Sequence, residues 1–260
     1  MHTHTQTFGQ GPRKALGIHC TLAHSGSLAA LGDALSDQVT MLAYDLPSHG
    51  KSQDWDGTGN LHDLATQMGR DVLTEPMDLI GHSFGATVAL RLAIEQPDLV
   101  RSLTMIEPVY FAAALRDDPE TVRAALSNNR DFDEAWEQGD TYGAARAFNR
   151  IWGDGSKWDD FSDRARTYMA DRIHFVAGSA AFLEHDSANL LSENKFRHAS
   201  MPALLIEGAK SMPIANVINT SIARRLPDVS RVSIANAGHM APLTHPEDVA
   251  VKIRAILDRT

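Results

Sequence analysis

Ser83 is the residue whose surroundings in this sequence most favour covalent chemistry, because it lies in the pentapeptide Gly81-His82-Ser83-Phe84-Gly85. The apolar run 77–80 before it is typical of a buried strand, and residues 86–96 after it are rich in helix formers and end at Pro97. Such a tight turn needs glycine where a side chain would collide with neighbouring backbone. The new helix also points free N–H groups at whatever the serine attacks. We therefore predict that Ser83 is a nucleophile.

A serine hydroxyl is a poor nucleophile unless a base lies beside it and a third group orients that base. Among the 12 histidines, His239 is our candidate base, because it follows Gly238 directly after the last strand-like run. Loops at the carboxyl ends of parallel strands meet at one edge of a sheet, so His239 can reach Ser83 despite their separation in sequence. His82, inside the pentapeptide, is expected to be a packing residue.

Short apolar runs alternate with helical segments along the chain, which is the order that gives a parallel sheet covered by helices on both faces. The runs expected as strands are residues 15–18, 39–44, 77–80, 102–106, 203–206 and 231–235. Apolar side chains at helical spacing predict a helix over 61–72. Thr244 and Glu247 resemble a capping box that opens a final helix. The fold class we predict is α/β, with a doubly wound, mostly parallel sheet.

The alternation breaks between residues 110 and 200, where no strand-like run occurs. This stretch carries every tryptophan except Trp55, among acidic and helix-forming residues. We interpret it as a helical insertion between two strands. Its aromatic side chains could line a substrate pocket or could only pack the insertion together; they are Trp136, Trp152, Trp158, Phe111, Phe148, Phe161 and Phe182.

Four motifs follow one another in the order found in α/β-hydrolase-fold proteins of the single-domain, cap-bearing type, which the chain resembles. They are the segment Ile18-His19-Cys20-Thr21, the loop Asp45-Leu46-Pro47-Ser48-His49-Gly50-Lys51-Ser52, the pentapeptide around Ser83, and Gly238-His239. The resemblance implies an α/β-hydrolase core over residues 1–109 and 201–260, and a helical cap over 110–200. It also implies that the loop containing Asp45 and His49 is structural.

The acid of the triad is where this sequence departs from the resemblance. The family usually places it in a Gly-x-x-Asp turn, but here that turn reads Gly208-Ala209-Lys210-Ser211. Some relatives carry the acid at the end of the strand after the nucleophile strand, where this chain has Glu107. A charged residue that ends an apolar strand needs a partner, because burying it unpaired is costly. We predict Glu107 as the acid; Glu207, a Ser-His dyad or a solvated Glu107 remain as alternatives.

The oxyanion hole is expected to combine two backbone N–H groups. The first belongs to Phe84, directly after the nucleophile, and the resemblance gives Thr21 as the second. Cys20 occupies the position of the family's glycine, which could alter the loop that presents Thr21.

Composition narrows the class of partner. The sequence has 24 Lys and Arg against 33 Asp and Glu, a net charge of −9 with no basic block, so we expect no nucleic-acid partner. It has no apolar run long enough to span a membrane and no secretion signal. With one cysteine, Cys20, we expect a cytoplasmic protein without disulfides. No metal site or cofactor is expected, and His2 and His4 are expected in a disordered tail.

Together these observations predict a serine hydrolase that cleaves an ester, lactone or related acyl bond through an acyl-enzyme. Its substrate is expected to be a small, compact and partly apolar molecule. Two other readings stay open: an acyltransferase with the same triad, and a ligand-binding protein that keeps the scaffold without the chemistry. The oligomeric state cannot be inferred from the sequence.

Overall fold

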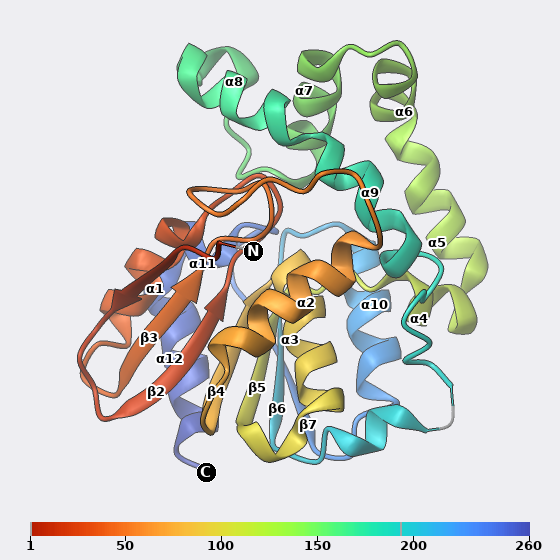
Figure 1. Ribbon diagram of the computed structural model, residues 1–260. Helices are drawn as coiled ribbons and strands as arrows, with labels where there is room; N and C mark the ends of the chain where they lie inside the picture. Colours follow the sequence, from red (N-terminus) through yellow and green to blue (C-terminus); the bar gives the residue numbers. More distant parts are fainter. Residues whose placement is uncertain (1, 193) are drawn as a thin grey trace.

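A seven-stranded sheet forms the centre of the protein in the computed structural model, which describes residues 2–192 and 194–260 (Figure 1). The spatial order is β1-β3-β2-β4-β5-β6-β7, and only β1 runs antiparallel to its neighbour. The strands are β1 Thr5–Phe8, β2 Arg13–Ile18, β3 Val39–Tyr44, β4 Met77–His82, β5 Val100–Ile106, β6 Ala203–Gly208 and β7 Val229–Ile234. The prediction of a doubly wound, mostly parallel sheet is confirmed.

Helices cover both faces of this sheet (Figure 1). One face packs against α2, α3 and α10, and the other packs against α1, α11 and α12, so that each face has its own cluster of buried apolar side chains. The α-helices of the described residues are α1 Ala29–Ala34, α2 Leu61–Val72, α3 Phe84–Glu95, α4 Phe111–Asp117, α5 Pro119–Leu126, α6 Arg130–Glu137, α7 Thr141–Trp152, α8 Asp163–Arg172, α9 His174–Leu183, α10 Pro213–Ala223, α11 Ala241–Thr244 and α12 Pro246–Leu257. The helix predicted over 61–72 is confirmed as α2.

Two local expectations were wrong. His2 and His4 do not lie in a disordered tail, because the His2 and His4 carbonyls accept the N–H groups of Gln53 and Asp45, which ties the start of the chain to the loop after β3. Thr244 does not cap the last helix. Its hydroxyl donates to the Met240 carbonyl instead, and α12 begins at a proline, which needs no partner for a backbone N–H.

Helices α4 to α9 lie between β5 and β6 in sequence, and no strand occurs there among the described residues. Figure 1 shows α6, α7 and α8 above the ends of the sheet strands. These three helices share a small apolar cluster that includes Phe132, Ala144 and Ala170. Helices α4 and α9 contribute to the main core instead, through Phe111 and Phe175. The division of the chain at residues 110 and 200 stays a prediction. Within the described ranges, no helix is both long and apolar enough to cross a bilayer.

Candidate active site

The turn between β4 and α3 holds Ser83 in an unusual backbone conformation, with φ +55° and ψ −118°. A non-glycine residue with positive φ is rare and costs energy that the surrounding structure must supply. The two flanking glycines have no room for a side chain: a Cβ on Gly81 would lie 2.4 Å from the Gly85 carbonyl oxygen, and one on Gly85 would lie 2.2 Å from that of Ile18. The sequence-based reason for both glycines is therefore confirmed.

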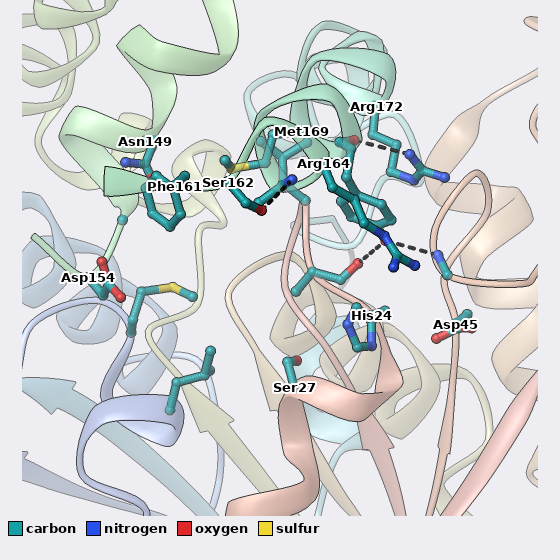
Figure 2. Close-up of a pocket in the computed structure, with 18 of the residues that line it drawn as sticks. His24, Ser27, Asp45, Asn149, Asp154, Phe161, Ser162, Arg164, Met169 and Arg172 are labelled. Carbon is teal, nitrogen blue, oxygen red and sulfur yellow. Dashed lines mark hydrogen bonds between the residues drawn. The ribbon is translucent and has the colours of Figure 1, made fainter. Parts of the chain in front are cut away.

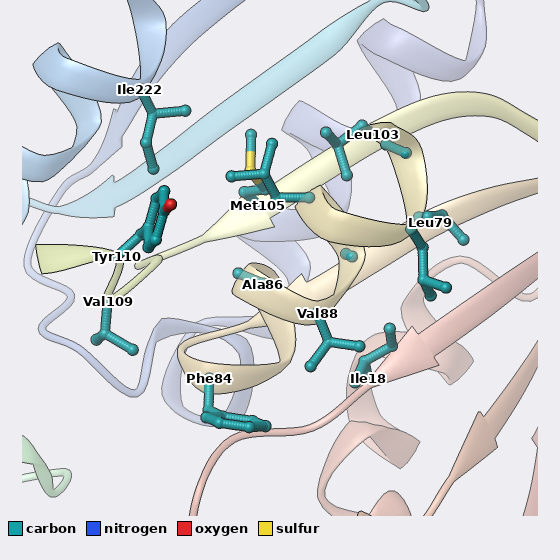
Figure 3. Packing of buried hydrophobic residues seen from close by; sticks show 14 of the residues in the cluster. Ile18, Leu79, Phe84, Ala86, Val88, Leu103, Met105, Val109, Tyr110 and Ile222 are labelled. Carbon is teal, nitrogen blue, oxygen red and sulfur yellow. The ribbon is translucent and has the colours of Figure 1, made fainter. Parts of the chain in front are cut away.

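The helix that follows Ser83 is anchored by burial along almost its whole length. Phe84 and Val88 of α3 lie among buried apolar side chains, together with Ile18 at the end of β2 (Figure 3). Every residue from Phe84 to Ile94 is buried. Such packing fixes the position of the first turn of α3, and hence of Ser83, relative to the sheet.

Ser83, His239 and Glu107 are joined by hydrogen bonds. The Ser83 hydroxyl lies 2.9 Å from His239 Nε2, and His239 Nδ1 lies 3.2 Å from Glu107 Oε2. All three are buried, Glu107 being only 2% exposed. The structure thus brings together the three residues that the sequence singled out.

Strand register explains why these side chains meet. His82 and Ile106 are paired across β4 and β5, so Ser83 and Glu107 each follow a paired residue at the carboxyl end of neighbouring strands. Glu107 has φ +51°, and its N–H still bonds the Ile206 carbonyl of β6 at 2.8 Å. His239 comes from the loop after β7, at the same edge of the sheet.

The second carboxylate oxygen of Glu107 is also engaged. Glu107 Oε1 accepts hydrogen bonds from the Gly208 N–H and the Ser211 hydroxyl, both at 2.6 Å. Ser211 occupies the position at which the family usually has its acid, and here it donates to Glu107, the candidate acid at the end of the neighbouring strand. Sequence reasoning missed this contact. The sequence did contain a signal for it. Ser211 stands where the family usually has its acid, and a small hydrogen-bond donor at that position faces the residue that replaces the acid.

Glu207, the other candidate acid, lies elsewhere. Its carboxylate accepts hydrogen bonds from the side-chain amides of Asn216 and Asn219 on α10, at 3.0 and 2.9 Å. Arg231 approaches the same carboxylate at 3.6 Å. These contacts hold the Glu207 side chain against α10.

His82 supports the histidine loop rather than the reacting serine. Its Nε2–H donates to the backbone carbonyl of His239 at 2.8 Å. Burial, and then the neighbouring imidazole of His239, lower the pKa of His82 to about 3, so it is neutral at physiological pH. The placement agrees with the expectation that His82 packs.

The loop after β2 carries Thr21 and is held by two histidines. His49 Nε2 accepts the Leu22 N–H at 3.0 Å, while His19 Nε2 accepts the Leu46 N–H at 3.0 Å. Burial lowers the pKa of His19 to about 4. Burial is also the largest cause that lowers the pKa of His49 well below its ordinary value. Both rings are therefore neutral and able to accept. The Leu22 N–H is thus taken by His49, and Thr21, the residue before it, lines the cavity beside Ser83.

Cys20, at the position of the family's glycine, does not itself have a positive φ. Leu22, with φ +61°, has the left-handed conformation in this turn. Cys20 is 3% exposed, and burial raises the pKa of its thiol to about 12, so it stays protonated and unreactive.

Asp45 has a structural place in the motif loop. Its two carboxylate oxygens accept the Ser25 N–H at 2.7 Å and the Lys51 N–H at 2.8 Å. A Cβ on Gly50 would lie 2.0 Å from one of these oxygens, so the loop closes tightly around the carboxylate. The expectation that Asp45 organises the loop fits these contacts.

A cavity of about 300 Å³ lies in front of Ser83. Trp152 reaches into it from α7 and packs edge-on against His239, with ring centroids 4.9 Å apart. Four of the aromatic side chains singled out in the insertion line this cavity, namely Phe111, Trp136, Phe148 and Trp152. The other three do not: Phe182 stacks on His62 in the core, and Phe161 and Trp158 line other hollows. Phe132, also in the cavity wall, was missed.

A second and larger hollow, of about 860 Å³, lies between α8 and the loops after β2 and β3 (Figure 2). Figure 2 shows Arg164 and Arg172 of α8 at one side of this cleft, and His24 and Asp45 at the other side. Tyr168 crosses from α8, where its hydroxyl donates to the Ala23 carbonyl at 2.7 Å. Ser83 does not line this cleft.

Comparison with known proteins places this geometry in a family. The chain matches the model described as the alpha/beta hydrolase family over residues 16–252. It is 27% identical over 256 residues to a pimeloyl-[acyl-carrier protein] methyl ester esterase of Stenotrophomonas maltophilia, which covers 96% of this chain and 95% of that protein. It is 22% identical over 228 residues to an (E)-2-((N-methylformamido)methylene)succinate hydrolase of Acinetobacter baylyi, covering 86% and 82% respectively.

A solved structure supports the fold independently. MenH from S. aureus superposes with a TM-score of 0.74 at 15% identity, over 98% of both chains. At this identity the likeness concerns the fold alone. Because the family match extends from β2 into the last helix and includes the turn at Ser83, the chain belongs to the alpha/beta hydrolase family.

Proposed function

We propose that the protein is a serine hydrolase that cleaves an ester, lactone or related acyl bond through an acyl-enzyme. The observation that carries the proposal is the continuous set of hydrogen bonds from Ser83 through His239 to Glu107. The names of the two relatives, one an esterase and one a hydrolase, also support bond hydrolysis.

In the first half of the reaction, Ser83 Oγ attacks the acyl carbon while His239 Nε2 takes its proton. A bond forms between Oγ and carbon, and the carbonyl electron pair moves to oxygen. When that intermediate collapses, His239 returns the proton to the leaving alcohol. Glu107 accepts the His239 Nδ1–H throughout, which keeps Nε2 free to accept and stabilises the imidazolium.

In the second half, water replaces the alcohol. His239 Nε2 removes a proton from the water as its oxygen attacks the acyl carbon, and then returns the proton to Ser83 Oγ as the acid leaves. His239 carries every proton transfer, to and from Ser83, the leaving alcohol and water, while Glu107 orients its ring, so the proposal involves no cofactor.

The negative oxygen formed in both halves requires donors that are already in place. We assign these to the backbone N–H groups of Phe84 and Thr21. Phe84 opens α3, where the first N–H groups of a helix have no partner within the helix. Thr21 lines the cavity beside Ser83, on a loop that His19 and His49 hold in place.

The substrate we propose is compact and partly apolar. A cavity of about 300 Å³ is at the small end of ligand sites, and its walls are mostly apolar and aromatic. Helices of the proposed cap, over residues 110–200, supply most of that wall. The cap would therefore govern which substrates are accepted.

Two alternatives differ from this proposal in outcome. An acyltransferase would use the same triad but deliver the acyl group to an acceptor other than water. A ligand-binding protein would need no triad, and the aligned Ser83, His239 and Glu107 favour an enzyme. As for its place of action, the buried free thiol of Cys20 suits a reducing compartment such as the cytoplasm.

Turnover of p-nitrophenyl acetate tests the proposal. The wild type should release p-nitrophenol and acetate in equal amounts, and Ser83→Ala should release neither above background while keeping its circular dichroism spectrum. Release of p-nitrophenol without acetate, made catalytic only by an added alcohol or amine, would indicate transfer instead. Equal activity in Ser83→Ala would contradict the assignment of Ser83.

A further inference from the structure

The cavity at Ser83 has an uneven distribution of charge. Two of its lining residues are carboxylates, Asp133 and Glu184, and none of the described residues that line it is Lys, Arg or His. The remaining polar side chains are the neutral Thr21, Asn129 and Ser179, apart from Ser83 itself. A substrate in this cavity therefore meets negative charge and no compensating cation.

The two carboxylates lie towards the open end of the cavity. Ser83 is 6% exposed, at the buried end, whereas Asp133 on α6 is exposed and Glu184, directly after α9, is half-buried. They come from separate elements that the fold brings to one opening.

Neither carboxylate has an ion-pair or hydrogen-bond partner among the side chains that the structure describes. Among the ion pairs and side-chain hydrogen bonds of residues 2–192 and 194–260, none involves the carboxylate of Asp133 or of Glu184. Burial, followed for Asp133 by the charge of Glu137, raises the pKa of Asp133. Burial also raises the pKa of Glu184, where the charge of Asp133 contributes in the same direction and that of His185 opposes it. The charge of Asp133 thus acts on Glu184, where it is smaller than the opposing effect of His185.

We infer that this cavity selects substrates that are neutral or positively charged at the end away from the bond to be cleaved, and discriminates against substrates with a carboxylate there. The inference rests on the proposed function, which places the reacting acyl carbon at Ser83 and leaves the far end of the substrate at Asp133 and Glu184. A second carboxylate at that end would be repelled, whereas a cationic group would gain the attraction that the protein leaves unused.

Three p-nitrophenyl esters test this selection. Two are isosteric at the far end: 4,4-dimethylpentanoate ends in a neutral tert-butyl group, and the ester of N,N,N-trimethyl-β-alanine ends in a trimethylammonium group of the same shape. The third, the monoester of glutarate, ends in a carboxylate. The quantity to compare is the ratio of kcat/KM for the cationic ester to that for the anionic ester. When this ratio is compared between variants, the intrinsic reactivity of each ester cancels.

Asp133→Asn and Glu184→Gln should each lower the cation-to-anion ratio by about five-fold at low salt, and the double variant by more. The kcat/KM of the neutral ester, measured in each variant, shows how much of the change in the ratio comes from the cationic ester and how much from the anionic ester. Glu134→Gln is the matched control, because Glu134 lies on α6, is exposed and does not line the cavity. It removes the same charge and should leave the ratio unchanged.

The result that overturns the inference is a ratio that stays constant in both cavity variants, or that falls equally in Glu134→Gln, while all three esters are turned over. A wild type that turns over none of the three, and whose Ser83 takes up no acyl group from them, would refute the proposed function and this inference with it. The two failures are therefore distinguishable in the same experiment.

Discussion

The cavity at Ser83 and the cleft beside Arg164 differ in both size and chemistry. The first measures about 300 Å³ and has apolar walls with two carboxylates, while the second measures about 860 Å³ and is bordered by Lys51, Arg164 and Arg172. Only the smaller one contains a serine bonded to an imidazole. Volume alone would have favoured the cleft over the cavity that contains Ser83.

The difference follows from what supports each hollow. Behind the Ser83 cavity lie the carboxyl ends of β4, β5 and β7, where register fixes the side chains within hydrogen-bond distance of one another. The cleft instead separates α8 from loops. The Tyr168 hydroxyl joins its two sides, because it accepts the Gly50 N–H at 2.9 Å and donates to the Ala23 carbonyl. Convergent strand ends mark the candidate for chemistry better than open space does.

The largest effect expected within this comparison is that of Glu107→Gln. A neutral amide can hold His239 in the wrong tautomer and cannot stabilise its cation, and loss of the acid has cost about 10⁴ in kcat in a serine protease. We expect a loss of that order in steady-state ester hydrolysis, with an unchanged circular dichroism spectrum.

Glu207→Gln is the matched control for this variant. It removes the same charge at the neighbouring strand end, from a carboxylate that Asn216 and Asn219 hold away from His239. Its activity should stay within about three-fold of wild type. A near-normal Glu107→Gln beside a crippled Glu207→Gln would move the acid to the other residue.

A smaller effect is expected for Ser211→Ala. The Ser211 hydroxyl donates to a Glu107 carboxylate oxygen, and a hydrogen bond to a charged group contributes roughly 1.5–3 kcal/mol, but the Gly208 N–H remains on the same oxygen. We expect kcat to fall about ten-fold with little change in KM, because Ser211 positions the acid and does not touch substrate. Ser211→Thr keeps the hydroxyl and should recover most of the loss. An unchanged kcat in Ser211→Ala would show that Ser211 does not help to position Glu107.

The smallest effect is expected in the cleft. Arg164 is exposed and lines only the larger hollow, so Arg164→Ala should change kcat/KM for a small neutral ester by less than about two-fold. Trp152→Ala is the contrasting variant, because Trp152 lines the Ser83 cavity and packs on His239. A loss above ten-fold in Arg164→Ala would show that the cleft participates, and would break the distinction drawn between the two hollows.

The sheet and the positions of Ser83 and His239 could be predicted because local patterns encode them. A mostly apolar strand, a turn that admits only glycine at two places and a helix stopped by Pro97 are all visible between residues 77 and 97. The place of Glu107 required the order of the strands as well, and this came from the resemblance to a family.

What the sequence did not reveal depends on contacts between distant segments. β1 pairs with β3 at the sheet edge, although the run Thr5–Phe8 has only one large apolar side chain to indicate a strand. Ser211 meets Glu107 only because β5 and β6 are neighbours. Asp133 and Glu184 share an opening through the packing of the inserted helices, which no local pattern encodes.

The central claim, that Ser83 is the nucleophile of an aligned triad, is tested most directly by intact-mass spectrometry after treatment with a fluorophosphonate. The account predicts one adduct per chain on the peptide that contains Ser83, no adduct in Ser83→Ala, and much slower labelling in Glu107→Gln, while Arg164→Ala is labelled at the wild-type rate. An unlabelled wild type, or an equal adduct on Ser83→Ala, would contradict it.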